Sequence, residues 1–321
     1  MNSKKLNVVR SISSADKFNS TYGVKYKNRF GGFIMSSFKQ EIKDFAVKNG
    51  VDLIGFASKD RFEGLTAHLN PFAIFPEGKT VIILGRRITR GTLRGIEEGT
   101  NFGDYGSFGY QWLDDEFVAQ SCYDVVRFIE DQGWEAVPIF PNPEESHGMG
   151  IPLGEGKAAP NVTPDFHYAA IACGLGEVGF CGEFLSEKFG HRQRFQMIIT
   201  DAIIESDPIC EESICDQCGK CAEVCPMGAI DKENFYTVDV CGKTMKVADI
   251  DYSLCEKCKN GAIPNRLYKG AKSDRLAALC LRTCMNHLEE KKAIESSFEN
   301  KFRKREAWAI DIYGKSVKVT E

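Results

Sequence analysis

Cysteine is the residue type whose number and spacing in this 321-residue chain best suit chemistry, since ten of its thirteen cysteines lie at or beyond residue 210. Four of them fall in the stretch CDQCGKCAEVCP and follow the spacing C-x2-C-x2-C-x3-C-P. Three thiolates spaced in this way bind three irons of one 4Fe–4S cluster, and the fourth cysteine reaches a different cluster. The spacing therefore predicts a cluster held by Cys215, Cys218 and Cys221, with Cys225 reaching a second one.

A second cluster requires more cysteines downstream, and the sequence supplies them. CEKC contains two, and CLRTC places two more one helical turn apart, on a segment for which Ser273 is the predicted cap. Eight ligands suffice for two 4Fe–4S clusters. By similarity to two-cluster ferredoxins, the first cluster is assigned Cys215, Cys218, Cys221 and Cys284, and the second is assigned Cys225, Cys255, Cys258 and Cys280.

The second assignment departs from the ferredoxin pattern, because 21 residues separate Cys258 from Cys280 where a ferredoxin has two. Cys210 and Cys241 are alternative ligands, and the alternatives for the second set as a whole are a zinc site or no second cluster. The other cysteines are interpreted as packing residues, namely Cys122 on an apolar helical face and Cys173 and Cys181 beside a glycine-rich turn.

Sequence patterns also predict the elements that must position these cysteines. Apolar periodicity and capping residues predict helices over 36–50, 111–132 and 165–172, and apolar runs predict strands over 51–57, 80–86, 135–140 and 195–202. Thr163 and Pro164 are the expected N-cap and first-turn residues of the third helix. The segment 141–164 holds five prolines and four glycines, and we expect a long functional or disordered loop there.

These elements predict an α+β chain with two domains. A mixed α/β domain covers 36–205, and a smaller cysteine-rich domain covers 206–292. The tail over 293–321 is expected to form a strand or a docking arm. Residues 1–35 are rich in lysine and arginine and are expected to be a flexible extension, with a presequence or a docked arm as alternatives.

Composition narrows the classes of partner. The net charge is −4 and the isoelectric point is about 5.9, without a long basic block, so binding to nucleic acid or an anionic membrane is unsupported. The chain contains no run of 18 apolar residues and no apolar core of a secretory signal near its start. We therefore expect a cytoplasmic protein.

The stretch GLGEVG matches the G-x-G-x-x-G pattern of dinucleotide-binding sites, through Gly174, Gly176 and Gly179. That pattern requires a strand before it and a helix after it, whereas here a helix is predicted before it, so NAD binding is disfavoured. The glycines still predict a tight turn where the backbone approaches another group closely.

A longer stretch around this turn, HYAAIACGLGEVGFCGEFLSEKFGHRQRFQMIITDA, resembles the corresponding segment of epoxyqueuosine reductases and of their relatives, the reductive dehalogenases. The resemblance extends over about 38–290, through GVDLIGFA, FPEGKTVIILGRRI and IEDQGWEAVPI. It implies a nitroreductase-like α/β sandwich that binds cobalamin, followed by a two-cluster ferredoxin-like domain. Electrons would then pass from the clusters to the cobalamin and on to a substrate.

The resemblance also implies candidate site residues. The cobalamin would be bound by His167, Gly174, Gly176, Gly179, Arg192 and Arg194, and Tyr110 is the candidate proton donor. The alternatives are a satisfied helix histidine for His167, surface ion pairs for the arginines and a packing role for Tyr110. The D-x-H-x-x-G motif of His-ligated cobalamin proteins is absent, because Ala170 stands in place of its glycine.

Two departures from epoxyqueuosine reductases argue against modified tRNA as the substrate. Those enzymes carry an acidic proton donor in an RDYH-type motif, and YGSFGYQWLDD has no match for that acid. They also commonly carry a C-terminal helical-repeat extension, which we do not expect in this chain. The chain is therefore similar to uncharacterised members of this superfamily.

The primary hypothesis is an oxygen-sensitive oxidoreductase that passes low-potential electrons through two 4Fe–4S clusters to a cobalamin, which reduces a small molecule. An external donor of the ferredoxin or flavodoxin type would supply the electrons. The alternatives are an electron carrier or corrinoid-activating protein without a substrate site, and a flavin-dependent reductase. The substrate, the donor and the oligomeric state cannot be predicted from the sequence.

Overall fold

An antiparallel four-stranded sheet, in the order β1-β2-β6-β3, organises the first two thirds of the chain. The strands are β1 (Leu53–Ser58), β2 (Thr80–Arg87), β6 (Gln193–Thr200) and β3 (Ala136–Ile139). Strands β2 and β6 are apolar on both faces and almost wholly buried, because helices cover both sides of the sheet. The computed structural model describes residues 35–146 and 150–319, so almost all of the predicted extension over 1–35 lies outside the described residues.

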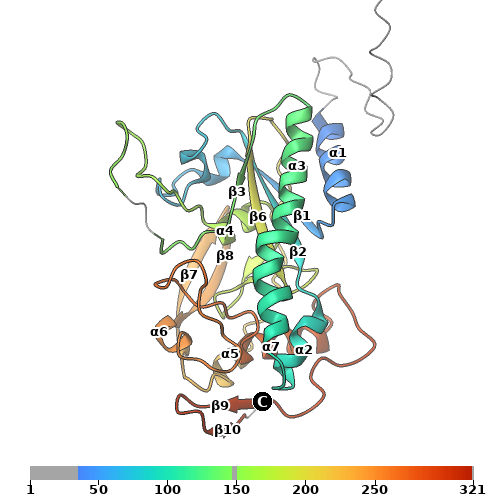
Figure 1. Ribbon diagram of the computed structural model, residues 1–321, viewed down its shortest axis with the longest axis vertical. Coiled ribbons are helices and arrows are strands. Elements are labelled where there is room, and N and C mark those ends of the chain that lie inside the picture. Colours follow the sequence, from blue (N-terminus) through green and yellow to red (C-terminus); the bar gives the residue numbers. More distant parts are fainter. Residues whose placement is uncertain (1–34, 147–149, 320–321) are drawn as a thin grey trace, which may run out of the picture. The chain divides into compact units, whose positions relative to one another are not determined.

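Two helices cover one face of this sheet, α1 (Met35–Lys48) and α3 (Ala119–Asp131), and lie side by side in Figure 1. Their apolar stripes, including Ile42 and Val125, pack against Ile82 and Ile198 in the centre of the sheet. The rings of Phe45 and Phe128 stack with their centroids 4.5 Å apart and join the two helices. Cys122 belongs to this core and is buried, as predicted.

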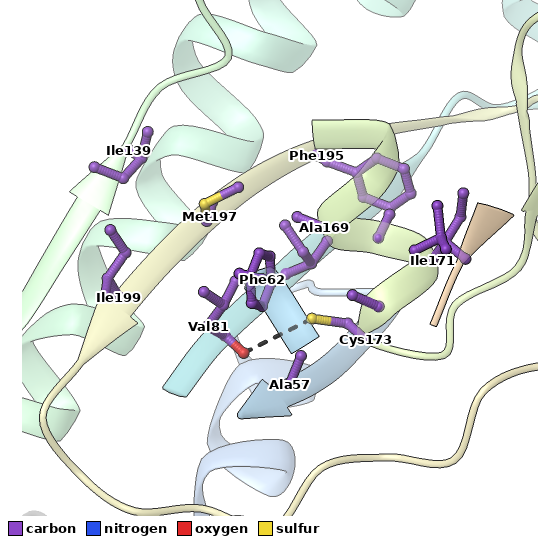
Figure 2. Packing of buried hydrophobic residues seen from close by; sticks show 14 of the residues in the cluster. Ala57, Phe62, Val81, Ile139, Ala169, Ile171, Cys173, Phe195, Met197 and Ile199 are labelled. Atoms are coloured by element: carbon purple, nitrogen blue, oxygen red, sulfur yellow. Dashed lines mark hydrogen bonds between the residues drawn. The ribbon is translucent and has the colours of Figure 1, made fainter. Parts of the chain in front are cut away.

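The other face is covered by α4 (Phe166–Ala172), whose small residues allow close packing (Figure 2). Ala169 packs among core residues of the central strands, and Cys173, just after the helix, donates a hydrogen bond to the carbonyl oxygen of Val81 at 3.7 Å. Cys173 is therefore a packing residue, as predicted. The predicted helix cap was wrong, because the side chain of Asp165 accepts the hydrogen bond from the Tyr168 amide at 2.8 Å.

The helix predicted over 111–132 is α-helical only in α3. Two π-helical segments precede it, η4 (Tyr105–Gln111) and η5 (Leu113–Val118). Gly109 permits this arrangement, since a Cβ there would lie 2.5 Å from the Tyr105 ring that packs on it. Single π turns inside helices are frequent at functional sites. These wider turns direct Tyr105, Tyr110 and Asp114 into the protein.

The cysteine-rich part contains elements that the sequence patterns did not predict. A hairpin of β7 (Ile230–Val240) and β8 (Lys243–Ile250) separates Cys225 from Cys255. Its turn residues Cys241 and Gly242 have φ of 54° and 85°, as a two-residue type I′ turn requires. The alternating stretch FYTVDV followed by Cys-Gly was the signal for this hairpin.

Three helices carry cysteines of this part, namely α5 (Lys220–Glu223), α6 (Tyr252–Cys255) and α7 (Leu279–Glu290). The predicted cap at Ser273 was wrong, because α7 starts six residues later. The backbone of Asp274 instead pairs with Ile263 in a short bridge, with hydrogen bonds of 2.8 and 2.9 Å. The tail forms a hairpin, β9 (Trp308–Ile310) and β10 (Ser316–Lys318).

The remaining elements are short. They are η1 (Lys59–Phe62), η2 (Pro71–Ala73), η3 (Arg90–Leu93), α2 (Arg94–Glu97), β4 (Glu177–Val178) and β5 (Phe184–Leu185). Residues 35–321 cluster as one compact unit, so the division into domains at residue 206 stays a prediction. Within 35–146 and 150–319, none of the helices has the length and apolarity needed to cross a bilayer.

Candidate iron–sulfur centres and the adjoining cleft

The first group of thiols combines a loop, a short helix and the long helix near the C-terminus. Cys215 precedes α5, Cys221 lies on α5 and Cys284 lies on α7, and the three thiols are electrostatic neighbours. Glu177 fixes the loop, because its buried carboxylate accepts hydrogen bonds from the amides of Ile214 and Cys215 at 2.8 and 2.7 Å. The structure therefore brings together three of the four cysteines assigned to the first cluster.

The fourth assigned residue, Cys218, lies at the surface beside this group. Its thiol lies within 4.8 Å of donor atoms of Asp216 and His287. Asp216 also accepts a hydrogen bond from the Cys218 amide at 3.3 Å and pairs with His287 at 2.9 Å. Cys218 is thus held at the outer edge of the first group, by polar residues that the sequence patterns did not single out.

Cys181 is buried in the core, as the packing interpretation expects, and it also lies on the inner side of the same group. Hydrogen bonds with the Cys221 and Cys284 thiols lower the pKa of the Cys181 thiol well below its usual value, although burial opposes them. The Nε2 atom of His191 lies 3.7 Å from the Cys181 Sγ atom and 3.3 Å from that of Cys284. The stretch GFCGEF gave no spacing signal for this role.

The second group contains all four cysteines assigned to the second cluster. Cys280 on α7 has Cys225 and Cys258 as electrostatic neighbours, and Cys255 has the same two. The 21-residue gap closes because the backbone bridge between Ile263 and Asp274 turns the chain back on itself. Cys210 and Cys241 do not join either group, since their thiols donate to Glu187 and to the carbonyl oxygen of Arg61.

The residues present in both groups fit iron–sulfur clusters. Apart from His191 and from Asp216 and His287 beside Cys218, the described donors of the two groups are thiols, and N–H groups point at the sulfur atoms. The backbone amides of Phe180 and Ala229 donate to Cys215 and Cys225 at 3.4 Å, and the side-chain amide of Asn260 donates to Cys258 at 3.8 Å. Such N–H donors stabilise the anionic sulfur of iron-bound thiolates.

A cleft of about 280 Å³ lies beside the two groups, at the junction of the α/β part and the cysteine-rich part. The side chains that line it are Tyr110, Asp114, Glu144, His167, Glu183, His191, Arg194, Tyr252, Lys272, Asp274 and Arg275, with others. Two of them connect the cleft to the thiols. His191 contacts the first group, and Arg275 interacts with Cys255 and Cys280 of the second.

Arg194 organises one wall of the cleft. It forms an ion pair with Asp274 and donates to the carbonyl oxygen of Gly109 and the hydroxyl of Tyr105, both at 3.1 Å. Its guanidinium carbon also lies 4.7 Å from the centroid of the Tyr110 ring. Arg194 and Tyr110 thus pack against each other in the same wall of the cleft.

Asp114 is the group in this wall best suited to hold a proton near neutral pH. Burial raises the pKa of its carboxyl from 3.8 to about 6, although Arg194 and Arg266, each 4.0 Å away, favour the ionised form. Burial also raises the pKa of the neighbouring Tyr110 hydroxyl. Asp114 lies in the stretch YGSFGYQWLDD, whose spacing gave no match for the acid of the RDYH-type motif.

The structure places only some of the predicted cobalamin-binding residues at the cleft. His167 and Arg194 line the cleft with Tyr110. Arg192 lies elsewhere, where it donates to Ser296 at 2.7 Å and is within 3.9 Å of Glu289. The glycine turn approaches protein backbone, since a Cβ at Gly174 or Gly176 would lie 2.1 or 1.9 Å from the carbonyl oxygens of Pro208 and Leu185. The structure does not bring Gly174, Gly176, Gly179 or Arg192 to the cleft.

The cleft does not fit a whole cobalamin. Its 280 Å³ is slightly below the range of about 300–1,000 Å³ typical of pockets for drug-sized ligands, and cobalamin is much larger than these. The cleft matches a small molecule instead.

Comparison with protein families identifies the class of binding sequence that the chain contains. A family model for a 4Fe-4S binding domain matches residues 211–231, which contain four of the predicted ligands. The chain therefore carries an iron–sulfur binding sequence in the predicted place.

Some of the individual relatives are reductases. The chain is 28% identical over 119 residues to tetrachloroethene reductive dehalogenases of Dehalobacter restrictus and Desulfitobacterium hafniense, which covers 36% of this chain and 18% of each relative. The match thus spans less than a fifth of these relatives' length. Over 23% of this chain it is also 33% identical to the large ribosomal subunit protein uL16 of Oenococcus oeni, covering 57% of that protein.

Two solved structures align with part of this chain. An epoxyqueuosine reductase from Streptococcus thermophilus aligns with 60% of this chain and 53% of its own, at 17% identity and a TM-score of 0.43. A catabolic reductive dehalogenase aligns with 87% of this chain and 39% of its own, at 17% identity and a TM-score of 0.48. The 4Fe-4S match and the dehalogenase relatives confirm the resemblance predicted from the sequence.

Proposed function

We propose that the chain is an iron–sulfur oxidoreductase in which two 4Fe–4S clusters supply electrons to a small molecule bound in the cleft. The observation that carries this proposal is that each cysteine group touches the cleft wall through one buried side chain. His191 reaches Cys284 of the first group, and Arg275 reaches Cys255 of the second. A bound 4Fe–4S cluster exchanges one electron at a time, so a pair supplies the two electrons of an ordinary organic reduction.

The chain's own thiols and amides hold the clusters in this proposal. The ligands are those assigned from the sequence, namely Cys215, Cys218, Cys221 and Cys284 for the first cluster and Cys225, Cys255, Cys258 and Cys280 for the second. The mutual proximity of the last four thiols, and of three of the first four, supports this assignment.

Asp114 and Tyr110 supply protons to the bound molecule. Reduction of an organic molecule adds negative charge, and a nearby acid must neutralise it. An acid works best when its pKa lies near the working pH, and the Asp114 pKa of about 6 meets this condition. Arg194 holds Tyr110 and Asp114 in place through its contacts with both.

The resemblance implies cobalamin between the clusters and the substrate, but the size of the cleft argues for direct reduction of a small molecule. An external donor of the ferredoxin or flavodoxin type supplies the electrons. Direct reduction is inferred from the volume of the cleft, and the external donor is inferred from the chemistry of the clusters. Quantifying the cofactors tests direct reduction.

The test is anaerobic purification of the whole chain, followed by measurement of iron, cobalt and flavin. We expect about eight iron atoms per chain, the content of two cubanes, with neither cobalt nor flavin after reconstitution with each cofactor. One cobalt per chain would overturn direct reduction and restore the cobalamin hypothesis. About four iron atoms would remove one of the two clusters.

A further inference from the structure

Arg275 is a buried guanidinium in the wall between the cleft and the second cysteine group. Its side chain is only 2% exposed, and it lies four residues before helix α7. The NH2 group donates to the carbonyl oxygen of Cys181 at 3.0 Å and to Glu183 at 2.8 Å. The guanidinium carbon lies 5.1 Å from the centroid of the Tyr252 ring. One edge of Arg275 is therefore fully bound by the protein.

The other edge has no acceptor. Among the residues that the structure describes, the Nε and NH1 atoms of Arg275 are buried and lack a hydrogen-bond partner. Leaving a buried donor unpaired costs about 1–3 kcal/mol, and more for a charged group. A fold that buries this edge is thus expected to provide an acceptor that the polypeptide alone does not contain.

The second cysteine group lies where that acceptor is needed. The guanidinium of Arg275 lies over the ring of Tyr252, the first residue of α6, and Cys255 is the last residue of that helix. Arg275 is an electrostatic neighbour of both Cys255 and Cys280. The guanidinium therefore lies beside these two thiols, but they do not satisfy Nε and NH1.

We propose that Arg275 donates hydrogen bonds from Nε and NH1 to sulfur atoms of the cluster held by the second cysteine group and thereby raises the reduction potential of that cluster. This inference rests on the proposed function, because it needs the second cluster. Reduction adds one negative charge to a cluster, which a buried cation and N–H donors stabilise. Among the ligands assigned to the first cluster, the Cys284 thiol contacts His191.

The experiment compares the wild-type chain with Arg275→Met, which keeps the length of the side chain but removes its charge and donors. Both proteins are purified anaerobically, their iron is counted, and each cluster is titrated with dithionite under potentiometric control while its electron paramagnetic resonance signal is recorded. We expect the equilibrium constant for one-electron reduction of the second cluster to be at least tenfold smaller in the variant. This change lowers its midpoint potential by about 59 mV. The first cluster should titrate as in the wild type.

Two control variants separate the local contact of Arg275 from a long-range effect of positive charge. Arg194→Met removes a cation from the same cleft without a described thiol contact, and it should shift the second cluster much less than Arg275→Met does. Glu183→Gln frees the guanidinium from its carboxylate and should shift the second cluster to higher potential. That variant retains Arg275, so the inference can be tested even if Arg275→Met loses iron.

The outcomes also separate this inference from the proposed function. Wild-type protein with two titrating clusters, and unchanged midpoints in both Arg275→Met and Glu183→Gln, would overturn the role of Arg275 while leaving the proposed function in place. Equal shifts of the second cluster's midpoint potential in Arg275→Met and Arg194→Met would show that only long-range charge acts on the cluster. That result would also overturn the proposed contact. Wild-type protein with a single cluster would contradict the proposed function itself.

Discussion

The Nε2 atom of His191 lies 3.3 Å from the Sγ atom of Cys284, while the same imidazole ring lines the cleft. The Nδ1–H group donates to the carbonyl oxygen of Phe184 at 3.0 Å, which orients Nε2 toward the thiols. The two residues are 93 positions apart in the sequence. They meet because α7 packs against the loop after the glycine turn, through Leu185 and Leu288.

Replacing His191 tests whether this contact links the first cluster to the cleft. We expect His191→Gln to keep about eight iron atoms but to alter the electron paramagnetic resonance spectrum of the reduced first cluster, because hydrogen bonds near the ligands tune a cluster. The matched control is His167→Gln, which also lines the cleft but has no described thiol contact. A variant spectrum identical to that of the wild type would rule out the link.

Separate replacement of the two α7 cysteines tests the ligand assignment. Cys284→Ala should remove the first cluster and Cys280→Ala the second, so each variant should hold about four iron atoms instead of about eight. Cys210→Ala is the control, since its thiol belongs to neither group, and it should keep the full content. Loss of the same cluster signal in both α7 variants would contradict the assignment.

Replacing Cys181 and Cys218 separately tests which of them is the fourth ligand of the first cluster. Because Cys218 belongs to the ferredoxin-type spacing, we expect Cys218→Ala to lose the first cluster, whereas Cys181→Ala should keep about eight iron atoms. Iron content and the resonance spectra of the reduced proteins measure both results. The reverse pattern would make the buried Cys181 the ligand in place of Cys218.

The Asp114 carboxyl should titrate near neutral pH. Its pKa is raised on folding, from 3.8 to about 6, so its stabilising contribution is full below about pH 4 and is lost as the pH rises through about 6. The difference corresponds to about 3 kcal/mol at 1.36 kcal/mol per pKa unit. Infrared difference spectra should show a protonated carboxyl band at about pH 5 that vanishes by about pH 7.

The matched variants for this titration are Asp114→Asn, which should lack the band, and Asp115→Asn, which should retain it. Asp115 is the neighbouring carboxylate, and its side chain is more exposed than that of Asp114. A wild-type band that disappears near pH 4 would show that Asp114 is an ordinary carboxylate and would remove it as the proton donor.

Gly176 is the position in the turn where a side chain is least tolerable. Its φ is +153°, and a Cβ there would lie 1.9 Å from the carbonyl oxygen of Leu185. Gly176→Ala should therefore lower the free energy of unfolding by about 2–4 kcal/mol through backbone strain and overpacking. Gly91→Ala, at a site with open space around it, is the control and should have little effect in thermal unfolding. Equal stability of the two variants would show that the turn can relax.

Much of the fold was predictable because its signals are local. The apolar runs that became β1, β2, β3 and β6, and the periodicity of α1 and α3, depend on residues a few positions apart. Two of the local expectations failed because of contacts that the apolar pattern does not encode. Ser273 does not cap α7 because Asp274 pairs with Ile263, and π-helical turns replace the start of the predicted helix because the Tyr105 ring packs on Gly109.

The sequence by itself determined the iron–sulfur character of the chain, since the spacing of Cys215, Cys218, Cys221 and Cys225 fixes ligand geometry within a single loop and helical turn. Only the tertiary structure decided which distant residues join them. Cys181, His191 and Arg275 reach the thiols because α7 packs against the glycine turn, and Asp114 acquires its raised pKa because the π-helical turns bury it beside Arg194. Packing of this kind depends on contacts between residues far apart in the chain, and no local spacing encodes it.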